Sequence, residues 1–344
     1  MAVNIVNELS ERGYHVYLCA TRSEGPLKSE INPGVNYFCL FRRSRYDLKA
    51  LKRLVDFTRL HDIEIIQAHS SSIFIAKILT LFVNKVRLLW HVHYGELSKT
   101  NNSSFFYRLI TNTISGIIVV NQPLKKWAIE ALMMDPNKVW LLPNFVRIIK
   151  SDKAFNIPGV KGYRIVSVAN LRPQKDHLTL IRAMKFIIEA EPDCHLLLAG
   201  SASDETVKDR IILEIKKLNL QNNVTWLGPR IDISELISNC DIGVLSSVSE
   251  GLPLALLEYG AAGLPVVVTD VGDCSYVVNS EKVGVVVPPQ CPQALANGML
   301  MYLRNPSMAI EAGKNLQNRI TQVFSAGNAL NQLEEIYQQV LNDK

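Results

Sequence analysis

The stretch DIGVLSSVSEGLPLALLEYGAAGLPVVVTD, residues 241–270, contains a complete local folding pattern. The apolar run Ile242–Leu245 predicts a short buried strand, and the run Val266–Thr269 predicts a second one. Between them, a small polar loop at 246–250 leads into a segment with helical spacing. Gly263 suits the left-handed residue that ends such a helix, and the proline two residues later prevents its continuation. The stretch therefore predicts a strand–loop–helix–strand unit.

The start of this helix is predicted to bind phosphate. Pro253 suits the first helical position, because its ring presets φ and its missing N–H would have no partner there. The backbone N–H groups of Gly251 and Leu252 then lie at a helix N-terminus, where anions bind. One apolar face of the helix is indicated by residues spaced three and four apart: Leu254, Leu257 and Ala261.

Two carboxylates flank the turn, Glu250 in the loop and Glu258 on the helix. An isolated pair at this spacing is more often one solvated residue and one capping residue. The run EGLPLALLE, followed by small residues, Gly-x-Pro-Val-Val and Val271-Gly272, resembles the signature of the retaining glycosyltransferases of family 4. The resemblance implies that Glu250 contacts sugar hydroxyls, the loop amides hold a nucleotide diphosphate, and Glu258 contacts the ribose. A carboxylate suits a diol because it accepts two strong hydrogen bonds.

The fold implied by the resemblance is α/β, with two Rossmann-like domains facing one cleft (GT-B). The length of 344 residues also favours two domains over one. We expect an acceptor-side domain at 1–150 and a nucleotide-sugar domain at 151–325, joined by the polar segment 151–162. The last helix, at 326–344, is expected to pack back on the first domain.

Composition describes a globular protein, with 48% hydrophobic and 20% charged residues. The sequence contains no apolar run of about 18 residues, as a membrane span needs, and its start lacks a secretion signal pattern. The six cysteines are scattered without a CxxC pair, which is typical of reduced cysteines in cytoplasm. We therefore expect a cytoplasmic protein with no cofactor, no bound metal and no nucleic-acid partner.

Charge is distributed unevenly between the two halves. Residues 1–150 carry 20 Lys and Arg against 11 Asp and Glu, while the remainder carries 17 against 21. Six basic residues fall on and before a predicted amphipathic helix: Arg42, Arg43, Arg45, Lys49, Lys52 and Arg53. Such a helix either lies on an anionic membrane or covers the sheet with a solvated basic face. Both interpretations remain open from the sequence.

The N-terminus departs from the family pattern. Residues 1–11 predict a helix, whereas a doubly wound domain normally begins with a strand and a glycine-bearing turn. Relatives would carry these in roughly fifteen further residues. We expect either a start that lies upstream or the loss of a central strand. The later parallel strands are predicted at 16–20, 35–41, 63–67, 88–92, 117–120, 139–142, 165–169, 195–199 and 224–227.

Histidines follow two strands of the first half. His91 and His93 stand near the carboxyl end of the strand at 88–92, where ligands bind in such folds. The resemblance implies a histidine at the donor sugar here, best matched by His93, with His69 a weaker candidate. Metal binding is not expected, because alternate residues of a strand point to opposite faces and no third ligand is evident. Asn144 matches the family's Pro-Asn before the second domain.

Cations are expected around the diphosphate, where they stabilise the charge of the leaving group. The family has an arginine and, five residues later, a lysine at the end of the strand 165–169. Lys175 matches the lysine, but Asn170 occupies the arginine position, and Arg172 is the substitute. Gly228 and Arg230 follow the strand 224–227, near the expected nucleotide base, and Arg230 is more easily read as a surface residue.

The resemblance implies transfer of a sugar from a UDP- or GDP-sugar to a hydroxyl of a lipid-linked or glycan acceptor, in surface polysaccharide biosynthesis. His93, Glu250, Lys175 and Arg172 are the expected catalytic residues, and domain closure would exclude water. The reaction would need no metal, and the sequence has no Asp-x-Asp pair. A non-catalytic sugar-nucleotide-binding subunit or an inactive truncated homologue is the alternative. A dinucleotide oxidoreductase is disfavoured because no G-x-G-x-x-G turn is present.

Overall fold

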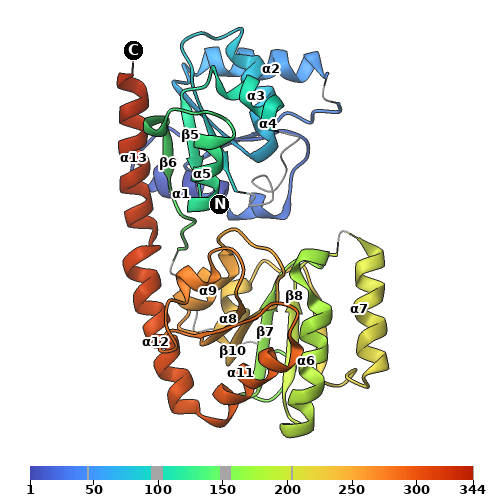
Figure 1. Cartoon of the computed structure of the whole chain (residues 1–344). Coiled ribbons are helices and arrows are strands. Elements are labelled where there is room, and N and C mark those ends of the chain that lie inside the picture. Colours follow the sequence, from blue (N-terminus) through green and yellow to red (C-terminus); the bar gives the residue numbers. More distant parts are fainter. Residues whose placement is uncertain (45, 94–103, 148–155, 203, 344) are drawn as a thin grey trace. The chain divides into compact units, whose positions relative to one another are not determined.

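The computed structural model describes every residue except 45, 94–103, 148–155, 203 and 344. It divides the chain into two compact units, each with parallel strands and surrounding helices (Figure 1). Unit 1 contains Met1–Asn144 and Ala326–Lys344, and unit 2 contains Phe145–Ser325. In the described ranges, no helix is both long enough and apolar enough to cross a membrane.

Unit 2 is built on one parallel sheet of six strands in the order β12-β11-β10-β7-β8-β9. The strands are β7 (Arg164–Val168), β8 (His195–Ala199), β9 (Val224–Gly228), β10 (Ile242–Leu245), β11 (Val266–Thr269) and β12 (Val285–Val287). The helices are η6 (Pro173–Lys175), α6 (His177–Ala190), α7 (Glu205–Lys217), α8 (Ile233–Ser238), α9 (Leu254–Ala261), α10 (Cys274–Val277), α11 (Pro292–Arg304) and α12 (Pro306–Val323). The predicted strands at 242–245 and 266–269 are confirmed with the same bounds.

In the sheet of unit 2, β7 has β8, the next strand along the chain, on one side and β10 on the other. The chain adds β8 and β9 on one side of β7 and then β10, β11 and β12 on the opposite side, so the strand order reverses between β7 and β10. In open α/β sheets, ligands bind beyond the carboxyl ends of the strands at such a reversal. The loops that follow β7 and β10 are therefore the two segments of unit 2 best placed to form a site.

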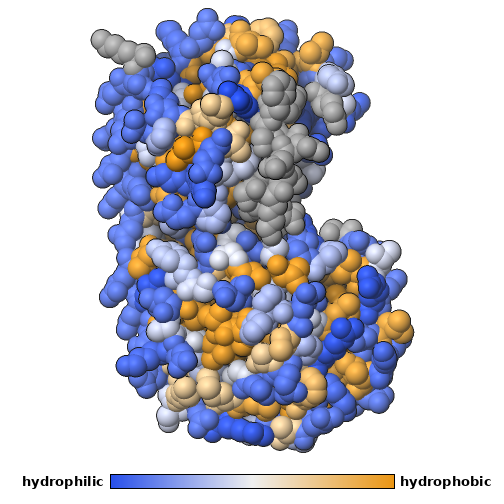
Figure 2. Space-filling model, in the orientation of Figure 1, coloured by the Kyte–Doolittle hydropathy of each residue, from blue (hydrophilic) through white to orange (hydrophobic). Residues whose placement is uncertain are grey.

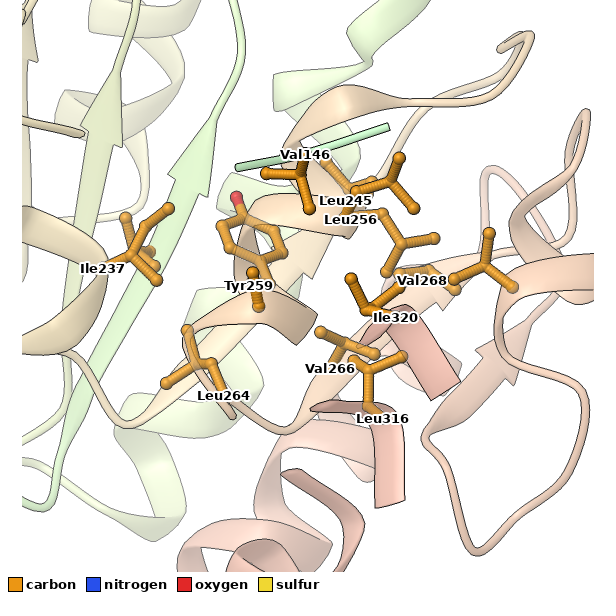
Figure 3. Close-up of a cluster of buried hydrophobic side chains, with 14 of the residues drawn as sticks. Val146, Ile237, Leu245, Leu256, Tyr259, Leu264, Val266, Val268, Leu316 and Ile320 are labelled. Atoms are coloured by element: carbon orange, nitrogen blue, oxygen red, sulfur yellow. The ribbon is translucent and has the colours of Figure 1, made fainter. Parts of the chain in front are cut away.

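Helix α9 is buried on more sides than the predicted apolar face, on which Leu257 and Ala261 are buried and Leu254 packs against the same core. Tyr259 is fully buried in the core of unit 2 (Figure 3). Gly243 of β10 leaves room for the Tyr259 ring, because a Cβ at Gly243 would lie 2.6 Å from a ring carbon. On another side, a Cβ at Gly260 would lie 2.5 Å from Ile320 of α12. Leu254, expected on the buried face, is only half-buried. Helix α9 therefore packs against β10 on one side and against α12 on another, a side that a surface helix would expose to solvent.

Unit 1 contains two separate parallel sheets, β1-β2 and β3-β4-β5-β6. The strands are β1 (Tyr17–Ala20), β2 (Asn36–Cys39), β3 (Ile65–His69), β4 (Arg87–Val92), β5 (Gly116–Val119) and β6 (Val139–Leu141). The helices are α1 (Ala2–Glu11), η1 (Pro26–Glu30), α2 (Leu48–Leu60), η2 (Ser70–Ser72), α3 (Ile73–Thr80), α4 (Ser104–Thr111), α5 (Gln122–Glu130), η5 (Pro136–Lys138) and α13 (Ala326–Asn342).

The N-terminal helix is confirmed as α1, and among the described residues no strand precedes it. β1 and β3 belong to different sheets. Both remain half-buried along most of their length, whereas β5 is fully buried. The strands of unit 1 described by the structure are thus divided between two sheets.

Two helices of unit 1 have clear roles in packing. The basic helix α2 buries Ala50, Leu54 and Val55 against a core that includes Ile75 and Leu79, so its apolar face covers the sheet. Helix α13 packs on unit 1 through a buried apolar face: Ala329, Leu330, Leu333, Ile336 and Val340. Its outward face is hydrophilic, as Figure 2 shows along the upper left edge.

Candidate functional site

The loop after β10 holds Glu250 against Lys175, two of the predicted site residues. Lys175 Nζ donates to Glu250 Oε1 over 2.5 Å, and the Ser247 hydroxyl donates to the same oxygen over 2.6 Å. The Glu250 side chain is only 9% exposed, so the carboxylate depends on these two donors. The sequence missed Ser247, although a small polar residue three positions before a loop carboxylate is well placed to donate to it.

Backbone hydrogen bonds fix the two loops to each other. Val248 N–H donates to Gln174 O over 2.9 Å, and the Ser246 hydroxyl donates to Lys175 O over 2.9 Å. Asp176 follows with a φ of 44° and is the N-cap residue of α6, where its side chain accepts from Thr179 N–H. The loops after β7 and β10 therefore form one rigid platform, and the position of the Lys175 ammonium is set by backbone contacts on both sides.

The turn at 250–253 rests on Gly272. This glycine has a φ of 57°, and a Cβ there would lie 2.4 Å from Glu250 O and 2.5 Å from Gly251 O. The next residue, Asp273, donates its N–H to Gly251 O over 2.8 Å. With its carbonyl turned toward Gly272, Gly251 keeps its own N–H without an acceptor among the described residues. The turn therefore offers a backbone donor at the start of α9, as an anion site requires.

Pro253 stands one position before the place predicted for it. It is the N-cap residue of α9, with ψ at 123°, and Leu254 is the first helical residue. Leu252 and Pro253 are both buried, so they anchor the turn in the core of unit 2. Glu258 lies one helical turn into α9 and is half-buried. The structure thus brings Glu250, Lys175 and the start of α9 together, with Glu258 on the same helix.

Other predicted cations of unit 2 differ in their availability. Arg172 is exposed and has no ion-pair partner in the described parts of the chain. Arg230 is held by Asp232 in a two-point ion pair, Nε to Oδ1 over 2.7 Å and a terminal nitrogen to Oδ2. The pair with Asp232 raises the pKa of Arg230. Arg172 is therefore the cation that a ligand can recruit without breaking an existing pair.

Asn170, which replaces the family's arginine, has a structural role. Its Oδ1 accepts from Ser201 N–H over 3.0 Å and from the Ser201 hydroxyl over 2.9 Å, which joins the end of β7 to the end of β8. Gly228, the last residue of β9, has a φ of 71°, and its carbonyl accepts from Gly200 N–H over 2.9 Å, which joins the ends of β8 and β9. Gly228 thus shapes the loop ends rather than presenting a side chain.

Asp273 is an additional polar group beside the turn. Desolvation by burial raises the pKa of this carboxyl to about 6. The carboxyl is therefore still mostly ionised near physiological pH, and its negative charge lies beside the turn. Sequence alone offered no signal for this residue beyond its place after Val271-Gly272.

Unit 1 contains a cluster of three histidines at the carboxyl edge of its sheet. His69 ends β3, His91 lies opposite it on β4, and His93 follows β4. His69 Nδ1 and His93 Nε2 are 2.8 Å apart, and the rings of His91 and His93 stack with centroids 4.2 Å apart. The expectation that His91 and His93 point apart is wrong, because the alternation of a strand does not extend past Val92, where β4 ends.

Burial keeps this cluster neutral. Desolvation, together with the neighbouring histidines, lowers the pKa of His69 to about 3 and that of His91 well below its usual value. The pKa of His93 falls to about 4, also mainly through desolvation, and a side-chain hydrogen bond with Asn144 acts in the opposite direction. The structure therefore joins Asn144 to His93, as two predicted site residues of unit 1.

A second layer holds His91. Gln67 Nε2 lies 2.8 Å from His91 Nδ1, and the Tyr337 hydroxyl donates to Gln67 Oε1 over 2.5 Å. Neither contact was predicted. Tyr337 lies 270 positions after Gln67 in the sequence, and only the packing of α13 on unit 1 brings them together.

The sequence and the fold of this chain are both similar to those of known proteins. The family model "Glycosyl transferases group 1" matches residues 149–319, and "Glycosyltransferase Family 4" matches residues 1–148. The Escherichia coli UDP-Gal:alpha-D-GlcNAc-diphosphoundecaprenol alpha-1,3-galactosyltransferase is 25% identical over 92% of this chain and 87% of its own. The Bacillus anthracis N-acetyl-alpha-D-glucosaminyl L-malate synthase is 22% identical over 98% and 92%.

Among solved structures, Anabaena HepE in complex with UDP and glucose matches with a TM-score of 0.81 and 19% identity, over 98% of this chain and 95% of that one. A glycosyltransferase from Rickettsia africae matches with a TM-score of 0.78 and 18% identity, over 99% and 94%. At these identities the likeness shows the shared two-domain α/β fold.

Proposed function

We propose that this chain, which belongs to the group 1 glycosyltransferases of family 4, transfers a sugar from a UDP-sugar or GDP-sugar to a hydroxyl group. The transfer retains the anomeric configuration. The acceptor is a lipid-linked or glycan molecule, and the product enters polysaccharide synthesis. The Escherichia coli relative, whose name contains both UDP-Gal and a diphosphoundecaprenol acceptor, supports this choice of substrates.

The observation that carries the proposal is the platform made by Lys175, Glu250 and the start of α9. A diphosphate bound at the Gly251 N–H would lie at the carboxyl edge where β7 and β10 diverge, with Arg172 available beside it. Lys175 exchanges part of its pairing with Glu250 for the diphosphate, and Glu250 becomes free to accept from sugar hydroxyls. Glu258 accepts from the ribose diol.

In the reaction, the bond from the anomeric carbon to the diphosphate oxygen breaks and a bond to the acceptor oxygen forms on the same face. The acceptor hydroxyl loses its proton to the departing phosphate oxygen. Lys175, Arg172 and the backbone donor at Gly251 stabilise the negative charge that grows on the leaving group. His93, neutral at physiological pH because burial lowers its pKa to about 4, offers a hydrogen bond to the donor sugar.

A thermal-shift screen of the full chain with UDP, GDP and their sugars tests the donor assignment, followed by a transfer assay with a polyprenol-diphosphate-linked sugar. We expect stabilisation by one nucleotide family and radiolabelled sugar transfer to the lipid. Absence of stabilisation by every nucleotide sugar would contradict the proposal.

A second candidate is a non-catalytic subunit that binds the sugar nucleotide without transferring the sugar. The divided sheet of unit 1 favours it, because this half is the one expected to bind the acceptor. Donor binding with a normal nucleotide preference, but without transfer to any acceptor, would support this candidate.

We further propose a cytoplasmic location with peripheral contact between unit 1 and an anionic membrane. The apolar face of α2 is used in the core, so this contact would depend on the basic residues and on Tyr46 and Leu48, which are 82% and 75% exposed. Co-sedimentation with phosphatidylglycerol vesicles but not with phosphatidylcholine vesicles is expected. Equal recovery with both would contradict it.

A further inference from the structure

The histidine cluster of unit 1 has the composition and spacing of a metal site. His69, His91 and His93 each offer one ring nitrogen, and these three atoms lie within 4.8 Å of one another. His69 and His91 are paired across the neighbouring parallel strands β3 and β4, whose ladder fixes their backbones, and His93 comes directly after β4 ends. Three imidazoles without a carboxylate favour zinc and similar transition metals over magnesium or calcium.

The distances fit a small movement upon binding. His69 Nδ1 and His93 Nε2 are 2.8 Å apart and share a proton. Two nitrogens bound to one zinc ion at a tetrahedral angle lie roughly 3.4 Å apart. The ion would replace the shared proton, which moves to the other nitrogen of its own ring, and the two nitrogens would separate by about half an ångström.

His91 supplies the second observation that points to a ligand. Its Nε2 is buried without a hydrogen-bond partner in the described chain, although buried nitrogens are normally paired. A half-turn of the Gln67 amide lets Gln67 Oε1 accept from His91 Nδ1–H while the amide donates to the Tyr337 hydroxyl. Nε2 then carries a lone pair. This is the second-layer arrangement of metal-bound histidines, whose other ring nitrogen donates to a carbonyl.

We propose that His69, His91 and His93 bind one divalent transition metal ion of the zinc class, leaving at least one coordination position open, and that its binding inhibits sugar transfer. Inhibition follows because His93 must exchange its hydrogen bond with His69 for one with the sugar, and a metal-bound His93 Nε2 cannot make this exchange. The binding part goes beyond the proposed function, and only the inhibitory part rests on it.

The test begins with metal binding by the purified full chain after treatment with a chelator. We expect one Co²⁺ per chain with the visible d–d absorption of a low-coordinate nitrogen site, displaced by Zn²⁺. Thiolate charge-transfer absorption would instead assign the ion to cysteine and overturn the proposal. His91→Ala and His69→Gln should each abolish the spectrum, while His15→Ala, which removes an exposed histidine elsewhere, should leave it unchanged.

Tyr337→Phe provides a variant that keeps all three ligands. We expect it to weaken Zn²⁺ binding by roughly tenfold or more, as losses in the second layer do, with an unchanged melting temperature for the apo chain. Unaltered binding in every histidine variant, or no stoichiometric binding in the wild type, would overturn the proposal. Because these measurements need no substrate, they are independent of whether transfer is detected.

The inhibitory part is tested by adding equimolar Zn²⁺ to the transfer assay and then removing it with a chelator. Reversible loss of at least about 90% of the rate at saturation is expected. Full activity of the zinc-loaded chain would refute inhibition while leaving the metal site and the proposed function standing.

Discussion

The two units gather polar side chains at the carboxyl edges of parallel sheets, but the sheets themselves differ. Unit 2 has six strands in one sheet, with β10 and β11 fully buried. Unit 1 divides its strands between two sheets, and β1 and β3 remain half-buried. In unit 2 backbone contacts between loops support the site, whereas in unit 1 side chains from β3, β4 and α13 support it.

The difference separates two kinds of rigidity. A turn held by glycine contacts and main-chain hydrogen bonds tolerates few substitutions, because any side chain added at the glycine would collide with the backbone. A cluster held by side chains tolerates changes more gradually, since each contact can be removed by itself. The turn at 250–253 of unit 2 should therefore be sensitive to substitutions that shift the backbone. The histidine cluster of unit 1 should be sensitive to substitutions that remove single side chains.

The largest effect is expected from Gly272→Ala. The new Cβ would lie 2.4 Å from Glu250 O on a residue whose φ is 57°, so the turn at 250–253 must move. We expect a loss of about 3 kcal/mol or more in unfolding free energy and at least about a hundredfold in UDP affinity, measured by urea denaturation and calorimetry.

Gly263→Ala is the matched control, with a φ of 74° but no atom closer than 3.5 Å to the added Cβ. It should cost only the strain of a left-handed alanine, about 1–2 kcal/mol, and leave UDP affinity unchanged. Equal effects of the two substitutions on UDP binding would show that contact with the turn is unimportant.

Hydrogen exchange compares the sheets directly. Backbone amides of β1 and β2 should exchange at least about a hundredfold faster than those of β10 and β11, because a two-stranded sheet with half-buried strands opens more readily. Mass spectrometry of peptides at neutral pH provides the measurement. Equal protection in the two units would mean that the divided sheet has no effect on local stability.

Removal of single side chains at the nucleotide site should have a smaller effect. Lys175→Ala and Glu258→Ala are each expected to weaken UDP-sugar binding or turnover at least tenfold, or ~1.4 kcal/mol, because each removes a charged contact to the diphosphate or ribose. Lys216→Ala, an exposed lysine on α7, is the control and should behave as wild type. Unchanged binding and turnover in both site variants would remove these residues from the donor site.

His93→Ala distinguishes the roles of the units. It should lower kcat by about tenfold while the affinity for UDP stays within twofold, since the nucleotide is expected to contact unit 2. His15→Ala is again the control. Loss of UDP affinity equal to the loss of kcat would show that His93 binds the nucleotide part of the donor.

The smallest effect concerns the pH dependence of stability through Asp273. Its pKa in the folded chain is raised to about 6 from 3.8, so the folded state binds the extra proton between these values and stability falls as pH rises through this window. Asp273→Asn should raise unfolding free energy at pH 7 by about 1 kcal/mol, since solvent screens part of the penalty, and by little at pH 4. Denaturation curves at both pH values measure this, and a gain at pH 4 alone would contradict it.

Local patterns in the sequence predicted the fold well. β10 and β11 were predicted residue for residue because short apolar runs bounded by polar or glycine-containing segments have few alternatives. Lys175 and Glu250 were both predicted as site residues after strands that a parallel sheet brings to one edge, but their ion pair was not predicted.

Features that depend on distant packing were not predicted. The burial of α9 on several sides depends on α12, and the support of His91 depends on Tyr337. The end of β4 at Val92 was predicted correctly, but the orientation of His93 was predicted wrongly because the alternation of the strand was extended one residue beyond that end.

The central claim is that the turn at 250–253 binds the diphosphate of a sugar nucleotide. Calorimetric titration of the wild-type chain with UDP and with uridine, repeated with GDP and guanosine, tests it most directly. For the preferred base, the nucleoside diphosphate should bind at least about a hundredfold more tightly than the nucleoside, and Lys175→Ala should shrink this difference. Equal affinity for nucleoside and nucleoside diphosphate would contradict the claim.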